Sequence, residues 1–264
     1  MPASLSACLI VKNEAAHLPR CLASVRELVD EMVVVDTGST DETPAIATAY
    51  GARVLAFAWR DDFSAARNFG LGQARGEWLL VLDADEALEP VARPQLEQLL
   101  GEAAVAAYEV GVRNFHPPDG AQYTDARSVR LFRNRPEFRF ENRIHEQIVN
   151  AIRRAGGRIA PSGLRVAHYG YLQAVVQGAE SRPERNLRLL EKAVAAEPEN
   201  AYLCAKLGLT YVADRRAHLA APHLRRALDL KARHPQVLND QTAALVRAAL
   251  AALERELAEQ SLPA

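Results

Sequence analysis

The sequence predicts an α/β fold, a mostly parallel sheet with helices on both faces, followed by an all-α tail. Two observations carry this prediction. Up to about residue 85, short apolar runs alternate with helical patterns, as in chains whose parallel strands are joined by helical crossovers. From about residue 180 onward, the pattern is helical only. We therefore divide the 264 residues into an α/β domain over 1–175 and a helical domain over 176–264.

The first 82 residues contain four predicted strands and three predicted helices. Leu5–Val11 is a continuous apolar run, and Glu14–Leu28 carries an apolar stripe typical of a helix. The other elements are a strand Met32–Asp36, a helix with Thr43 as N-cap and Pro44 at its first position, a strand Arg53–Phe57, a helix Asp62–Ala74 and a strand Trp78–Leu82. Ligands of parallel sheets bind at the carboxyl ends of strands, so we expect the chemistry to follow Val11, Val35 and Leu82.

The region from about Val105 to Tyr171 has a different pattern. Strand-like runs are expected at Ala106–Val112, Val129–Phe132, Ile144–Val149 and Leu164–His168. The stretch Arg127–Arg143 contains six arginines and two glutamates. These arginines either form a solvated strand face or contact phosphate or sugar beside an acidic site.

The helical tail contains a repeated pattern. Leu190–Ala193 (LEKA) and Leu224–Ala227 (LRRA) are 34 residues apart. Each precedes a proline, Pro198 or Pro235, and the characteristic residues Leu207, Gly208 and Tyr211 lie between the two segments. This period and pattern resemble tetratricopeptide repeats, of which the tail would hold roughly one and a half to two. A plain helical bundle is the alternative.

Composition limits the classes of partner. The formal net charge of −1 argues against a general nucleic-acid binder. No stretch approaches the ~20 apolar residues of a membrane span, so no transmembrane segment is expected, although peripheral membrane contact stays open. The apolar run Leu5–Val11 lacks a cleavage site, so we expect no signal peptide. Cys8, Cys21 and Cys204 are widely spaced, which favours reduced thiols in a cytoplasmic protein.

The strand Trp78–Leu82 ends in an unusual concentration of carboxylates. Asp83, Asp85 and Glu86 fall within four positions, which is costly unless a positive charge lies beside them. On an extended chain, Asp83 and Asp85 point to the same side. Paired carboxylates suit Mg²⁺ or Mn²⁺, and such a cation can bind a diphosphate. Alternatively, these residues only end the strand and begin a helix.

Two further motifs carry polar residues to the same sheet edge. Asp36 closes a strand in "VVVDTGSTDET", where its carboxylate can accept from a nucleoside imide and Gly38 lets the backbone turn. Arg67 and Asn68 lie in "ARNFG", on the helix before the acidic strand. Arg67 can pair with a phosphate or with the acidic cluster itself.

The stretches "SLSACLIVKNEAAHLPRCLASV", "VVVDTGSTDET", "DDFSAARNFGLGQARGEWLLVLDADE" and "NRIHEQ" together resemble a family 2 glycosyltransferase of the GT-A type over residues 4–171. A tetratricopeptide-like tail recurs in one bacterial branch of that family. The resemblance implies inverting transfer of a sugar from a nucleotide sugar, usually a UDP-sugar, assisted by Mn²⁺ or Mg²⁺. The acceptor would be a protein, a peptide or a cell-envelope glycan.

The resemblance also implies roles for particular residues of the donor site. Asn13 or Glu14 would lie beside the base or ribose, Asp36 would hydrogen-bond the base, and Arg67 would lie near the base and phosphates. Asp83 would bind ribose or reach the metal through water, and Asp85 would ligate the metal. His168, which ends a predicted strand, is the candidate third ligand. The alternative for His168 is a satisfied core histidine.

One carboxylate should act as general base on the acceptor. We choose Glu146, in "RIHEQI", because it lies far enough downstream to belong to the acceptor-binding half. A structural ion pair with the adjacent His145 is the alternative for this residue, and Asp125 is the second candidate for the base.

Two other functions compete with the transferase. A phosphatase of the haloacid dehalogenase type also has Asp-x-Asp after an apolar strand, with the first Asp as nucleophile. Here Glu86 and Ala87 follow the motif, and no lysine occurs between Lys12 and Lys192, whereas that fold needs a downstream Lys or Arg. A tetratricopeptide-type interaction protein with an inactive transferase domain is the other alternative, and intact Asp36, Asp83 and Asp85 argue against it.

Overall fold

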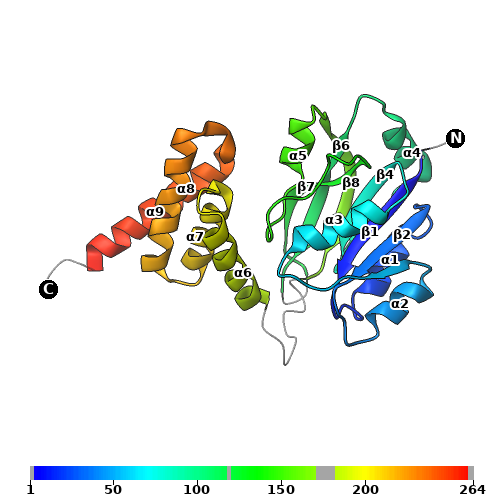
Figure 1. Ribbon diagram of the computed structural model, residues 1–264, viewed down its shortest axis with the longest axis horizontal. Coiled ribbons are helices and arrows are strands. Elements are labelled where there is room, and N and C mark those ends of the chain that lie inside the picture. Colours follow the sequence, from blue (N-terminus) through cyan, green and yellow to red (C-terminus); the bar gives the residue numbers. More distant parts are fainter. Residues whose placement is uncertain (1–2, 118–119, 171–181, 261–264) are drawn as a thin grey trace. The chain divides into compact units, whose positions relative to one another are not determined.

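Figure 1 shows the computed structural model of the chain, which describes residues 3–117, 120–170 and 182–260. The chain divides into two compact units, Met1–Gln177 and Gly178–Ala264. The domain boundary expected between residues 175 and 176 lies outside the described residues.

The first unit is built on one eight-stranded sheet in the order β3-β2-β1-β4-β7-β6-β8-β5. Its strands are β1 (Leu5–Val11), β2 (Glu31–Asp36), β3 (Arg53–Ala56), β4 (Trp78–Asp83), β5 (Glu86–Leu88), β6 (Ala107–Phe115), β7 (Tyr123–Arg133) and β8 (Ile159–His168). The pairs β1–β2, β1–β4, β2–β3 and β6–β8 are parallel, whereas β4–β7, β5–β8 and β6–β7 are antiparallel. The sheet is therefore mostly parallel, as predicted, with antiparallel pairings confined to its second half.

Helices cover both faces of this sheet. They are α1 (Leu18–Val25), α2 (Thr43–Ala49), α3 (Phe63–Gln73), α4 (Arg93–Gly101) and α5 (Val149–Arg154). Side chains of β4 alternate between two cores: Leu80 packs with apolar residues of α1, α2 and α4, and Leu79 with those of α3 and α5. This double burial explains why the central strands appear in the sequence as continuous apolar runs.

The first four strands lie within one residue of their predicted bounds, but two details of the helices differ. The helix predicted at Glu14–Leu28 spans only Leu18–Val25, because turns occupy the residues on both sides. Thr43 does not cap its own helix; its Oγ1 accepts from the N–H of Glu14 at 2.8 Å, and Glu42 precedes the helix instead. Thr43 therefore ties two loops at the sheet edge together.

The strand predicted at Ile144–Val149 is wrong. This segment is a loop with a single bridge between Glu141 and Gln147, followed directly by α5. Left-handed backbone at Asn142 (φ 70°) and His145 (φ 51°) interrupts any extended run. Short apolar runs do not distinguish a strand from a buried loop, and here the apolar side chains simply anchor the loop in the core.

The second unit is helical throughout its described part, as predicted. It contains α6 (Arg182–Ala196), α7 (Ala201–Ala213), α8 (Ala217–Arg233), a 3₁₀ turn η1 (Pro235–Val237) and α9 (Asp240–Gln260). α7 and α8 pack closely at Gly208, where an added Cβ would meet Leu224 Cδ2 at 2.6 Å. The hydroxyl of Tyr211 donates to Glu191 Oε1 of α6 at 2.7 Å. The Leu-Gly and Tyr signals of the sequence thus mark contacts between successive helices.

Two further observations bear on the environment of the chain. None of the helices in the described part combines the length and apolar character needed to cross a bilayer. Cys8, Cys21 and Cys204 are buried and unbridged. Burial raises the pKa of Cys8 to about 12 and also raises that of Cys21, so both remain as unreactive thiols.

Candidate active site

The acidic motif lies where two strands meet. β4 ends at Asp83, the chain turns over the next two residues, and the short strand β5 then runs antiparallel to β8. This pairing sets Glu86 opposite His168, and the N–H of Tyr169 donates to the carbonyl of Asp85 at 2.9 Å. Strand pairing therefore brings a late histidine to the acidic motif.

Asp85 and His168, two residues of types that ligate metals, lie close together at this point. His168 Nε2 lies 3.6 Å from Asp85 Oδ2. Burial alone would lower the pKa of His168, but the Asp85 carboxylate outweighs it and raises that pKa, with Glu86 and Asp83 adding to the effect. The prediction that Asp83 and Asp85 point to one side assumed an extended chain, but a turn occupies residues 84 and 85, and the two carboxylates have different partners. The alternative of a helix start is wrong, since β5 follows.

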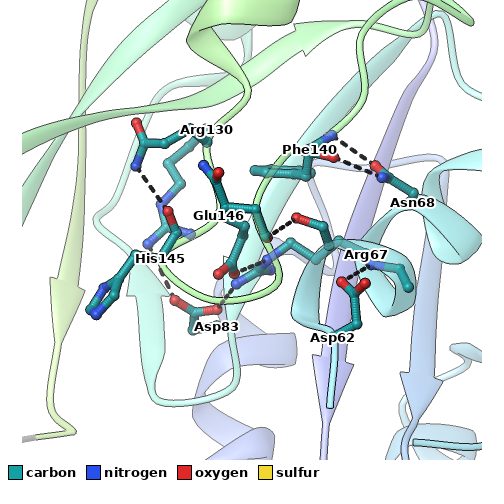
Figure 2. A network of polar contacts seen from close by, with 12 residues as sticks. Asp62, Arg67, Asn68, Asp83, Arg130, Phe140, His145 and Glu146 are labelled. Carbon is teal, nitrogen blue, oxygen red and sulfur yellow. Dashed lines mark hydrogen bonds and ion pairs between the residues drawn. The ribbon is translucent and has the colours of Figure 1, made fainter. Parts of the chain in front are cut away.

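Asp83 is held between two arginines, as Figure 2 shows. Arg67 Nη2 donates to Oδ1 at 2.5 Å, and Arg130 Nη2 donates to Oδ2 at 3.2 Å. Burial of the carboxyl opposes ionisation, but these two guanidinium groups outweigh it and hold the pKa of Asp83 well below its usual range. The positive charge that the carboxylate cluster requires thus comes from the protein itself.

Glu86 faces the interior and completes this arrangement. It is 2% exposed, its Oε1 accepts from Arg130 Nη2 at 2.6 Å, and its Oε2 accepts from the N–H of Asp83 at 2.9 Å. Burial raises the pKa of Glu86 to about 7, against the lowering effect of Arg130. Glu86 therefore fixes the backbone of the motif from the interior side, whereas the Asp83 side chain is 36% exposed and that of Asp85 8%.

Arg67 also reaches the predicted general base. Its Nε donates to Glu146 Oε1 at 2.6 Å, across 79 residues of sequence. The imidazole of His145 points away from Glu146 in Figure 2. The ion pair of Glu146 is thus with Arg67, and the alternative of a pair with His145 is wrong. Asp125, the second candidate, has a side chain 62% exposed on β7 and lies 3.5 Å from Arg113.

α3 holds the loop that carries Glu146. The carboxamide of Asn68 donates to the carbonyl of Phe140 at 2.9 Å and accepts from its N–H at 2.8 Å (Figure 2). Ser64 Oγ donates to the carbonyl of Asn142 at 2.5 Å, closer to the helix N-terminus. Together with the Arg67 ion pair, these bonds bind one helix to the loop at successive points. The loop keeps its left-handed residues because α3 holds it in this shape.

The predicted nucleotide-binding residues lie at the adjoining strand ends. Val11 of β1 pairs with Asp36 of β2, and Ile10 of β1 pairs with Asp83 of β4, so the motifs share one sheet edge. The Asp36 carboxylate accepts from the N–H of Gly38 at 3.2 Å, in a turn where Gly38 has φ 101°.

The two loops after β1 and β2 are tied together. The N–H of Asn13 donates to Ser39 Oγ at 2.9 Å, and Asn13 Oδ1 accepts from the N–H of Thr40 at 2.7 Å. Glu14 joins the same contact through Thr43. The structure thus brings Asn13, Glu14 and Asp36 together along the edge that Asp83 also occupies.

The side chains at this site fit a cation that takes some of its ligands from the protein and the others from a bound substrate. Within the described ranges, no three His, Cys, Asp or Glu side chains are close enough to hold a metal together. Asp83, predicted as a ligand, is engaged by arginines, which leaves Asp85 and His168. Mg²⁺ typically uses one or two carboxylates plus substrate phosphates and waters. The pair therefore suits a cation completed by a bound diphosphate.

The sequence interpretation missed three residues of the site: Glu86 as a buried support, Arg130, and Asn114, whose Oδ1 lies 2.8 Å from His168 Nδ1. Arg130 was one of six arginines in its stretch. Its signal was its place within the apolar strand "VRLF", where a buried charge requires a partner. No local signal marks Asn114, because its contact depends on pairing of distant strands.

Comparison with known proteins agrees with this architecture. The family described as Glycosyl transferase family 2 matches residues 6–159, so the chain belongs to that family. It is 44% identical over 213 residues to a tetratricopeptide repeat-containing protein of Synechococcus elongatus, covering 78% of this chain and 52% of the relative. It is 28% identical over 195 residues to the SPbeta prophage-derived glycosyltransferase SunS of Bacillus subtilis, covering 73% and 45%. The chain thus spans about half the length of these relatives.

Among solved structures, the chain is similar to glucosyl-3-phosphoglycerate synthase from Mycobacterium tuberculosis in complex with Mn²⁺, UDP and phosphoglyceric acid. The identity is 21%, the TM-score 0.46, and the match covers 63% of this chain and 70% of that one. Family membership excludes the haloacid dehalogenase phosphatase, and the sheet with its two helical layers is of the GT-A type expected for the family.

We predict that Asn68→Ala lowers the free energy of unfolding of the first unit by about 2 kcal/mol, since two hydrogen bonds of about 1 kcal/mol each are lost. Both tryptophans, Trp59 and Trp78, lie in this unit, so tryptophan fluorescence during urea unfolding measures it alone. Asn150→Ala, at an exposed position of α5, is the matched control. Equal stability of the two variants would show that the hydrogen bonds between Asn68 and the Phe140 backbone do not hold the loop.

Proposed function

We propose that the chain transfers a sugar, with inversion, from a nucleoside diphosphate sugar to a hydroxyl or thiol of an acceptor, assisted by a divalent cation. The observation that carries the proposal is the pair Asp85 and His168, joined by the β5–β8 ladder at the carboxyl end of β4 in a family 2 chain. The donor is proposed to be a UDP-sugar, and the acceptor a protein, a peptide or a cell-envelope glycan.

The binding of the donor is proposed to follow the sheet edge. The base would lie against the tied loops of Asn13, Glu14 and Asp36, with the Asp36 carboxylate accepting from its imide. The ribose would meet Asp83, whose carboxylate is already oriented by Arg67 and Arg130. Because this carboxylate is already fixed as a hydrogen-bond acceptor, it needs no rearrangement when the nucleotide sugar binds, which favours affinity.

Asp85 and His168 would hold Mn²⁺ or Mg²⁺, which when bound neutralises charge that develops on the departing diphosphate. Asp83 stays ionised beside the diphosphate because the two arginines lower its pKa. Arg67 and Arg130 are themselves paired with Asp83, Glu86 and Glu146, so the cation, rather than these two arginines, is proposed to neutralise the diphosphate.

Glu146 is the proposed general base. Arg67 donates to Oε1. Among the described residues Oε2 has no hydrogen-bond partner, so Oε2 can take the proton from the attacking hydroxyl or thiol. The ion pair also holds the carboxylate in place, with Arg67 Nε 2.6 Å from Oε1. This arrangement suits an acceptor nucleophile that attacks as its proton leaves.

The proposal is tested by calorimetric titration of UDP with Mn²⁺ or Mg²⁺ and with chelator. Asp85→Asn should weaken metal-dependent UDP binding by more than about 10-fold, since even outer partners of a metal site contribute about 10- to 100-fold. Asp214→Asn, in the second unit, is the matched control and should bind as wild type does. Failure of the wild-type chain to bind any nucleotide under any metal condition would favour the inactive, interaction-type alternative.

Glu146→Gln should keep donor binding and lose transfer by about 10²- to 10⁴-fold, the usual contribution of a general base. Hydrolysis of the donor, in which water replaces the acceptor, measures this without an identified acceptor. Asp125→Asn should hydrolyse the donor as wild type does. Equal loss of binding and hydrolysis in Glu146→Gln would mark Glu146 as structural, and loss in Asp125→Asn would assign the base to Asp125.

A further inference from the structure

Three neighbouring strands align polar groups behind His168. The register pairs Asn114 of β6 with His168 of β8 on one side and with Thr124 of β7 on the other. Asn114 Oδ1 lies 2.8 Å from His168 Nδ1, and Asn114 Nδ2 donates to the backbone carbonyl of Thr124 at 3.3 Å. The three residues form a continuous row across the sheet that ends beside Asp85.

This row determines which nitrogen of His168 carries a proton. The Thr124 carbonyl only accepts, so the amide nitrogen of Asn114 must face it and the amide oxygen must face His168. That oxygen also only accepts, so the proton lies on His168 Nδ1. In the neutral imidazole, Nε2 then carries the lone pair, and Nε2 is the nitrogen 3.6 Å from Asp85 Oδ2.

We infer that Asn114 is a positioning residue that fixes His168 in its Nδ1–H tautomer, so that Nε2 presents its lone pair beside the Asp85 carboxylate to a divalent cation. This inference rests on the proposed function, in which Asp85 and His168 share that cation. Two acceptor atoms facing each other at this distance need a proton or a cation between them. Outer partners of this kind orient a ligating histidine and raise its basicity.

The first test needs no metal and no substrate. Long-range ¹⁵N–¹H correlation spectra of the metal-free, histidine-labelled chain are recorded where imidazoles are neutral, with the His168 signals identified by their loss in His168→Gln. Wild type should show a protonated Nδ1 and an unprotonated Nε2. Asn114→Leu should lose this preference, and Asn114→Asp, which keeps an acceptor oxygen, should retain it. A wild-type proton on Nε2 would overturn the inference.

The second test measures Mn²⁺ binding in the presence of UDP. Asn114→Leu should weaken Mn²⁺ by about 10- to 100-fold, with Asn114→Asp close to wild type. The exposed Asn150→Leu is the matched control and should bind as wild type does. Unchanged Mn²⁺ affinity in a folded Asn114→Leu would overturn the inference while leaving the metal site intact.

The two failures remain distinguishable. If wild type binds no Mn²⁺ with UDP, the proposed function fails, and the tautomer spectra still decide what Asn114 does to His168. If Asn114→Leu does not fold, the wild-type tautomer and the behaviour of Asn114→Asp decide instead. A neutral His168 with its proton on Nε2, in wild type or in Asn114→Asp, contradicts the inference.

Discussion

The site depends on one interaction, the Asp83 carboxylate bound between Arg67 and Arg130. Through it, the end of β4 contacts a helix on one side and the antiparallel half of the sheet on the other. Arg67 extends the network to Glu146 and Arg130 extends it to Glu86, so the carboxylates are brought together without uncompensated repulsion. Buried pairs of this kind are costly to break, because removing one partner leaves a charge away from water. The positions of the proposed donor and acceptor groups are therefore coupled through two guanidinium groups.

The antiparallel half of the sheet supplies what the parallel half lacks. Parallel strands bring their carboxyl ends to one edge, which accounts for the loops after β1, β2 and β4. β5 and β8 then return a histidine to the acidic motif, and β6 and β7 place a carboxamide and a carbonyl behind it. The left-handed loop held by α3 brings the proposed base to the same arginine that orients Asp83. Residues more than 80 positions apart thus meet because of strand pairing.

Local patterns in the sequence predict the strands that are buried on both faces of the sheet. The central strands are buried on both faces and were found within one residue, and Asp83, Asp85 and Asp36 were placed at the correct edge. The turn after Asp83 was missed because carboxylates on an extended chain and on a turn have the same spacing. The apolar pattern predicts a strand at 144–149 where the structure has a loop, because these apolar residues are buried in either conformation. Partners such as Arg130 and Asn114 depend on the register of distant strands, which local periodicity does not encode.

The central claim is that Asp85 and His168 hold a divalent cation beside a nucleoside diphosphate. Anomalous diffraction at the manganese edge, from crystals grown with Mn²⁺ and UDP, tests it most directly. The account predicts one strong peak within coordination distance of Asp85 Oδ and His168 Nε2, with diphosphate oxygens completing the shell, and no such peak in Asp85→Asn crystals. Bound UDP with manganese on other residues, or UDP bound at this edge with no manganese peak, would contradict it.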